Sequence, residues 1–268
     1  MHMPEAGIDS VKVNQQLAAL AALCDLEQLD PVGDWTVDRW VMSAEAIDRL
    51  VETYSDLLIP VDTELDDLLQ EDGVDLTTLL LDEDHTADPI TRSDMTELAA
   101  TASAVRSHGL DLNASVLPNI PKGSRSQSGF GVDVLTTSVS PGPISSPLKD
   151  DEWLLICSVK HTVADGSDMR HKLDISLGLP LPYLTAQVRV LHGRMAERGD
   201  RLDRVFLTLA DFPNGPHIRV IGAGCADKDH ADQFLKSLGH FSGAPFDHGH
   251  VRCIEIAGMQ ELHERINV

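Results

Sequence analysis

The sequence has little of several features that would narrow its class at once. Its four cysteines are scattered and include no Cys-x-x-Cys pair, so we expect neither a structural zinc site nor an oxidising compartment. No apolar run approaches the ~20 residues that a membrane-spanning helix needs, and the acidic start, Met1 to Ser10, does not have the pattern of a signal peptide. The low aromatic share and ordinary apolar share predict a soluble globular protein, and together these features predict a cytoplasmic one.

Basic residues are also scarce: the chain has 21 Lys and Arg against 43 Asp and Glu, which gives a net charge of −22. Residues 1–120 hold 25 acidic and 5 basic side chains, whereas residues 121–268 hold 18 and 16, with nine of the twelve histidines. A polyanion could therefore approach the nearly neutral second part of the chain if its basic residues cluster. The acidic first part is explained by a solvated, salt-adapted surface or by a docking surface for a basic partner.

Apolar periodicity divides the chain into two regions. Helical patterns after Ser10 and after Ser43, followed by acidic leucine-bearing segments, predict an acidic helical region over residues 1–90, which would serve regulation or partner docking. Residues 91–268 alternate helical and strand patterns and predict an α/β domain with a mixed central sheet flanked by helices. After residue 162 we expect a helix that begins at Asp165 or Ser167 and runs to about residue 177, and further helices at 183–198, 231–238 and 260–266. Strands are expected at 205–209, 217–221 and 251–256.

The most informative stretch runs from Gly129 to Thr162. Two short apolar runs, separated by a turn rich in Ser and Pro, predict neighbouring strands of a hairpin. The first run contains Asp133 and the second ends near Lys160. An Asp and a Lys that converge across paired strands provide a metal ligand and a cation for a phosphate, but they also describe an ion pair at the edge of an ordinary sheet.

These residues, together with a preceding helix that carries Glu97, resemble the PD-(D/E)XK nuclease superfamily. The resemblance covers about residues 91–210 and implies a restriction-endonuclease-like core, in which a helix supplies Glu97, the second strand Asp133 and the third strand Lys160. It implies that Glu97 and Asp133 hold Mg²⁺ (or Mn²⁺) and that Lys160 stabilises the charge that develops on the phosphate.

The sequence departs from the family pattern two residues before the lysine. The family usually has an acidic residue or Gln there, whereas this chain has Ser158, a neutral and weak metal ligand that would orient water or a ligand. Three outcomes follow: Glu97 compensates from its helix, the metal is held more weakly through waters, or the site is inactive.

Six residues near these positions are candidates for contact with the substrate backbone, and each also has an ordinary structural explanation as part of a polar loop, turn or solvated helix face. They are Lys122, Arg125, His161, Thr162, Arg170 and Lys172.

The sequence as a whole predicts a metal-dependent nuclease that cleaves DNA in prokaryotic defence or restriction. A narrower resemblance is to nuclease-like subunits that work beside a helicase in anti-phage systems such as Hachiman, which implies a helicase or ATPase partner; a homodimer is a further possibility. A catalytically inactive nuclease-like scaffold that binds DNA or a partner is one alternative. An acidic interaction protein that mimics DNA is another.

Overall fold

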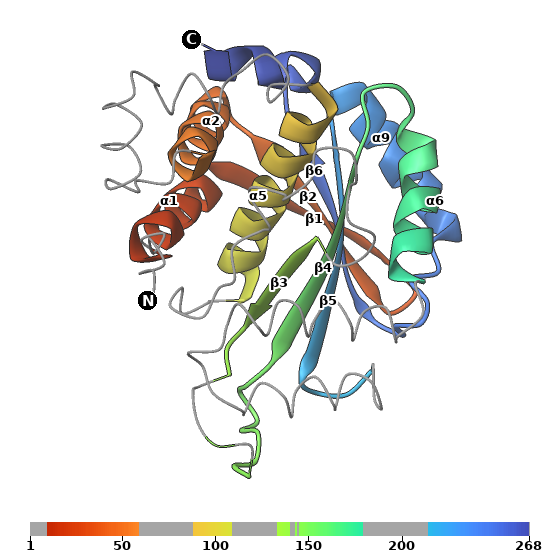
Figure 1. Ribbon diagram of the computed structural model, residues 1–268. Helices are drawn as coiled ribbons and strands as arrows, with labels where there is room; N and C mark the ends of the chain where they lie inside the picture. Colours follow the sequence, from red (N-terminus) through yellow and green to blue (C-terminus); the bar gives the residue numbers. More distant parts are fainter. Residues whose placement is uncertain are drawn as a thin grey trace.

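The computed structural model describes residues 10–58, 88–108, 133–139, 143, 145–178 and 214–267. These residues form a sheet with helices on both faces (Figure 1). In chain order the elements are α1 (Ser10–Ala22), β1 (Cys24–Val32), β2 (Trp35–Met42), α2 (Ala44–Leu58), α5 (Asp88–His108), β3 (Val134–Thr137), β4 (Leu154–His161), α6 (Gly166–Leu177), β5 (Ile218–Ala226), α9 (Lys228–Ser237), η3 (Leu238–His240), β6 (Gly249–Glu255) and η4 (Met259–Asn267).

The sheet has six strands in the order β1-β2-β6-β5-β4-β3. Strands β2, β6, β5 and β4 run parallel to one another. The two outer strands, β1 and β3, each pair antiparallel with their neighbour. The predicted α/β class, with a mixed central sheet flanked by helices, is therefore confirmed.

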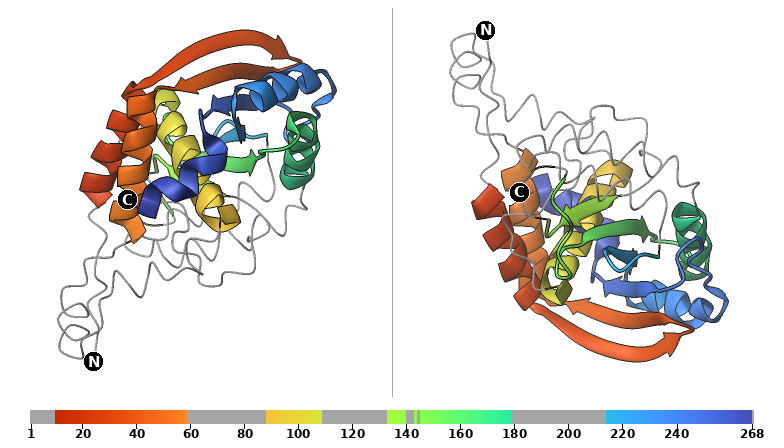
Figure 2. Two further views of the ribbon diagram at one scale, coloured as in Figure 1. Left: turned by 90° about the horizontal axis from the view of Figure 1, so that it is seen from above. Right: turned by 90° about the horizontal axis from the view of Figure 1, so that it is seen from below.

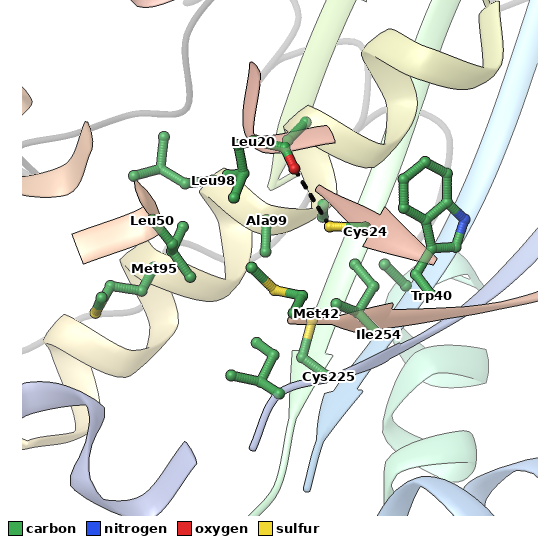
Figure 3. Close-up of a cluster of buried hydrophobic side chains, with 14 of the residues drawn as sticks. Leu20, Cys24, Trp40, Met42, Leu50, Met95, Leu98, Ala99, Cys225 and Ile254 are labelled. Carbon is green, nitrogen blue, oxygen red and sulfur yellow. Dashed lines mark hydrogen bonds between the residues drawn. The ribbon is translucent and has the colours of Figure 1, made fainter. Parts of the chain in front are cut away.

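One face of the sheet is covered by α1, α2 and α5 (Figure 2). Side chains from these helices and from the strands beneath them form a single buried apolar cluster, which Figure 3 shows in part. Arg106 near the end of α5 donates hydrogen bonds to the carbonyl oxygens of Ala21 and Cys24, both at 2.8 Å, so it satisfies acceptors where α1 ends and β1 begins.

The opposite face is covered by α6 and α9. Strand β4 contributes to both faces by alternation, because Leu155, Cys157 and Val159 lie in the first cluster and Leu154 and Ile156 lie in the second. The same alternation places Ser158 and Lys160 on the face that α6 and α9 cover.

Local sequence signals explain where several helices begin. The side chain of Ser43 accepts a hydrogen bond from the backbone N–H of Ala46 at 3.1 Å, and α2 follows it. Asp165 caps α6, because its carboxylate accepts from the backbone N–H of Ser167 at 2.8 Å. The hydrogen bonds from Ser167 lower the pKa of Asp165 below its ordinary value. Both helix starts confirm the prediction from sequence.

The prediction of a wholly helical N-terminal region is wrong for residues 24–42. These residues form the hairpin β1–β2, with Gly33 at a φ of 59° in its turn, and β2 pairs with β6 in register from Trp35 to Val41. The strands of the first 90 residues thus belong to the same sheet as those of the later residues. The burial of β2 on both faces explains the difference: Trp35 and Val37 lie in one apolar cluster and Trp40 and Met42 in the other, so the strand does not alternate apolar with polar residues.

The later elements agree with the predictions at 165–177, 217–221, 231–238 and 251–256 within a few residues at most boundaries. The last described helix is a 3₁₀ helix, η4, and α5 begins at Asp88, so it crosses the predicted boundary between residues 90 and 91. The predicted helix at 183–198 and strand at 205–209 lie outside the described residues. None of the described helices combines the length and apolar character needed to cross a membrane.

Two glycines of β5, Gly222 and Gly224, allow the helices of the second face to pack closely. A Cβ atom built on Gly224 would lie 2.8 Å from Phe234 Cε1, and one on Gly222 would lie 2.9 Å from Leu173 Cδ2. Glycine at both positions of this Gly-Ala-Gly segment therefore has a packing explanation.

Gly224→Ala is expected to destabilise the fold by ~1–3 kcal/mol, because the added methyl group overpacks a buried contact with Phe234. The urea midpoint of unfolding measures this change. Gly239→Ala is the matched control, since a Cβ there meets no atom within 4 Å. Equal midpoints for the two variants would contradict this description of the packing.

Candidate active site

Asp133, Ser158 and Lys160 meet where β3 begins and β4 ends. Val134 pairs with Cys157, and the backbone N–H of Asp133 donates to the carbonyl of Cys157 at 3.0 Å, which places Asp133 beside Ser158. Lys160 Nζ lies 3.3 Å from Asp133 Oδ2. The expected convergence of Asp133 and Lys160 across paired strands is therefore present.

The carboxylate of Asp133 uses its two oxygens differently. Oδ2 accepts hydrogen bonds from the backbone N–H of Val159 at 2.6 Å, from Lys160 Nζ at 3.3 Å and from Ser158 Oγ at 3.4 Å. Oδ1 accepts no hydrogen bond from the residues that the structure describes. Three donors on one oxygen fix the orientation of the carboxylate and leave the other oxygen available to a ligand.

Ser158 is almost fully buried, with 2% of its surface exposed. Its hydroxyl lies 2.7 Å from the hydroxyl of Ser176 on α6. If Ser158 donates to Asp133, Ser176 donates to Ser158, and the two hydroxyls form a short chain that ends on the carboxylate. Ser158, two residues before Lys160, thus holds Asp133 in place.

Ser176 was not among the residues singled out from sequence. The signal was a polar residue on the apolar face of α6, one residue before Leu177 and three after Leu173, both buried against the sheet. A small polar residue at such a position indicates a hydrogen-bond partner on the facing strand.

Glu97 lies on α5, the helix that covers the face of β4 opposite to Ser158 and Lys160. It is 2% exposed and accepts a hydrogen bond from Ser93 Oγ at 3.3 Å. Its charge acts on Cys157, which lies on the same face of β4 as α5; burial raises the pKa of this thiol most, and the negative charges of Asp133 and Glu97 raise it further. The structure brings Asp133 directly to Lys160 and Ser158 and places Glu97 across the strand.

A magnesium site at this position would depend mainly on Asp133. Within the described ranges, no group of three His, Cys, Asp or Glu side chains is arranged to hold a metal ion. Mg²⁺ is commonly held by one or two carboxylates together with waters and substrate phosphates, so Asp133 Oδ1 fits the role of its protein ligand.

Several of the residues predicted to contact substrate take part in local structure. Thr162 Oγ1 accepts from the backbone N–H groups of Ala164 and Asp165 at 3.2 and 3.1 Å, in the turn before α6. Arg170 pairs with Asp174 at 2.9 Å and Lys172 with Asp168 at 2.7 Å, each along α6. His161 ends β4 and is half-buried. Lys122 and Arg125 lie outside the described residues.

A second polar cluster, which the sequence did not indicate, lies beyond β5 on the neighbouring strands β6 and β2, on the face that α5 covers. The side chain of Arg252 on β6 is fully buried and bonds Asp38 Oδ2 at 3.2 Å and Ser103 Oγ at 3.1 Å. Its guanidinium also lies 5.1 Å from the ring centroid of Trp40. Arg252 therefore joins β6, β2 and α5, and its role is structural.

No protein-family model matches this sequence, and no curated protein is similar to it. A function for the chain is therefore argued from the geometry of its residues.

Proposed function

We propose that this chain is a metal-dependent nuclease of the PD-(D/E)XK type that cleaves DNA phosphodiester bonds in prokaryotic anti-phage defence or restriction. The observation that carries the proposal is the meeting of Asp133 and Lys160, 27 residues apart in sequence, at 3.3 Å on adjacent strands. The strands hold both groups rigidly, as a catalytic site requires.

Each residue of the site has a chemical role in this proposal. Asp133 Oδ1 would ligate Mg²⁺ or Mn²⁺, and a bound ion would neutralise the scissile phosphate and make a water nucleophilic. Lys160, whose side chain is 26% exposed, would stabilise the charge that develops on the phosphate. Ser158 would keep Asp133 oriented and order a water or ligand, and Glu97 would add negative charge from α5.

The proposed substrate and partners follow from the charge distribution and from the family resemblance. DNA would approach the nearly neutral second part of the chain, and the acidic first part would dock a protein such as a helicase or ATPase. The cytoplasm is the compartment in which such a defence protein acts, and a Hachiman-like system is the narrowest context that the residues favour.

Metal binding tests the proposal independently of cleavage. Native protein is expected to bind Mn²⁺, followed by the paramagnetic signal of the free ion, and Asp133→Asn is expected to bind it at least about tenfold more weakly. Asp150→Asn, an exposed site in a turn, is the matched control and should bind as the native protein does. Equal affinities for the native protein and Asp133→Asn would reject Asp133 as a metal ligand.

A catalytically inactive nuclease-like scaffold that binds DNA or a helicase is the second candidate. It is favoured by the buried Ser158, because a hydroxyl bonded to Ser176 at 2.7 Å replaces the carboxylate that the family pattern usually has there. Such a scaffold would bind DNA or a partner equally well in the presence of Mg²⁺ and of a chelator, and would cut nothing.

A further inference from the structure

No described element covers the outer edge of strand β1. Among the described strands it pairs only with β2, and Figure 2 shows it beyond the described helices of both faces. Most of its nine residues are exposed. An edge strand of this length presents backbone N–H and C=O groups that can pair with another extended chain.

The side chains of β1 give this edge a defined chemistry. Asp25, Glu27 and Asp30 are exposed and make no salt bridge or hydrogen bond with other described residues, and no basic residue occurs between Cys24 and Asp34. Arg39, which lies opposite Glu27 on β2, is already paired with Asp232 and Glu255 on the neighbouring elements.

An apolar side chain accompanies these charges. Leu26 is 47% exposed and is one of two large apolar residues with that degree of exposure among the described residues. It pairs in register with Trp40, on the face of the sheet that buries Cys24, whereas Asp25 and Glu27 project to the other face. The edge therefore offers an apolar position on one face and acidic positions on the other.

We propose that β1 is a docking strand for an extended, basic segment of a partner protein, which adds to the sheet beside residues 24–30. The partner strand would alternate apolar residues, on the face of Leu26, with Lys or Arg, on the face of Asp25 and Glu27. Pro31 lacks an N–H group and so limits the pairing to the residues before it.

The negative charge of β1 favours a basic segment over a second copy of this chain. A second copy of this chain, paired through the same strand, would bring Asp25, Glu27 and Asp30 against their own equivalents, and like charges on adjacent strands destabilise the pairing. A basic segment relieves this repulsion and supplies the missing partners of three carboxylates. This inference is independent of the proposed nuclease chemistry at the far side of the sheet.

The test uses fluorescein-labelled nine-residue peptides and the full-length chain. A peptide that alternates Lys and Val is expected to bind saturably in fluorescence anisotropy and to slow amide hydrogen exchange in residues 24–32. Two control peptides separate the contribution of charge from that of strand pairing. A Lys–Pro peptide has the same charge but cannot extend a sheet, and a Glu–Val peptide has the wrong charge; neither is expected to bind.

Matched variants locate the site. Asp25→Asn with Glu27→Gln is expected to weaken binding of the Lys–Val peptide about three- to tenfold, as two exposed ion pairs predict. Asp150→Asn with Asp151→Asn removes the same charge from an exposed turn next to β4 and should leave binding unchanged. The proposal is overturned if the Lys–Val peptide does not bind, if the Lys–Pro peptide binds equally well, if the protected amides lie outside β1, or if both double variants weaken binding equally.

Discussion

Arg252→Met is expected to lower the free energy of unfolding by about 3–5 kcal/mol, the largest effect on stability that the described residues predict. The side chain of Arg252 is fully buried and its partner Asp38 is 11% exposed, so the variant leaves a carboxylate without its hydrogen-bonded cation. His250 Nδ1, 3.8 Å from Asp38 Oδ2, remains beside the carboxylate in this variant, but at that distance it is a weaker partner than the guanidinium. Urea unfolding at pH 7 measures the loss.

The effect depends on pH in a defined direction. Burial alone would raise the pKa of Asp38, but the interactions with His250 and Arg252 outweigh it and lower the pKa below the ordinary value. The charged Asp38 therefore stabilises the native fold above the pKa of an unfolded Asp, about 3.9, and this contribution is lost as the pH falls through the lowered pKa of the folded protein. The difference in the free energy of unfolding between the native protein and Arg252→Met should therefore become smaller as the pH falls.

A double variant separates the ion pair from the volume it occupies. Arg252→Met with Asp38→Leu removes both charges and should recover much of the stability that Arg252→Met loses, because buried pairs are often replaced by apolar residues at little cost. A double variant as unstable as the sum of the two single variants would contradict a direct coupling between Arg252 and Asp38.

Lys160→Ala is expected to reduce DNA cleavage about 10²–10³-fold, the largest effect on activity. The ammonium group is the cation that the structure places against Asp133, at 3.3 Å, and the proposed chemistry uses it to stabilise charge on the phosphate. The rate of plasmid nicking with Mg²⁺ measures the loss.

Lys236→Ala is the control for Lys160→Ala, because Lys236 is an exposed lysine in the last turn of α9 and is not among the candidate substrate contacts. It should cut at the native rate within about threefold, since exposed charges contribute little to stability. If the two variants lost activity to the same extent, the loss would reflect the removal of any positive charge and would contradict a specific role for Lys160.

Much of the region around the candidate site could be predicted from the sequence. The two apolar runs separated by a turn gave the antiparallel pair β3 and β4, and Asp165 before an apolar repeat gave the start of α6. These features are local, because they follow from alternation, turn residues and capping within a few residues of chain. The approach of Asp133 to Lys160 follows directly from the pairing of two such strands.

The features that sequence reasoning missed depend on distant contacts. Strand β1 consists largely of exposed polar residues and owes its strand structure to pairing with β2, while the place of β2 in the sheet depends on β6, more than 200 residues later. Arg252 and Asp38 are 214 residues apart and meet only through that register. The link from Ser176 to Ser158 likewise requires the docking of α6 on β4. Patterns within one segment carry no information about such pairings.

The most direct test of the nuclease proposal is cleavage of plasmid and linear DNA by the native chain, with Mg²⁺ or Mn²⁺ and with a chelator, beside Asp133→Ala. Cutting is expected to require the metal and to be lost in Asp133→Ala, with DNA binding retained. The assay is to be run with the chain alone and with its genomic neighbour present. No cutting under either condition, or equal cutting by Asp133→Ala, would contradict the proposed activity, and metal-independent DNA binding without cutting would favour the inactive scaffold.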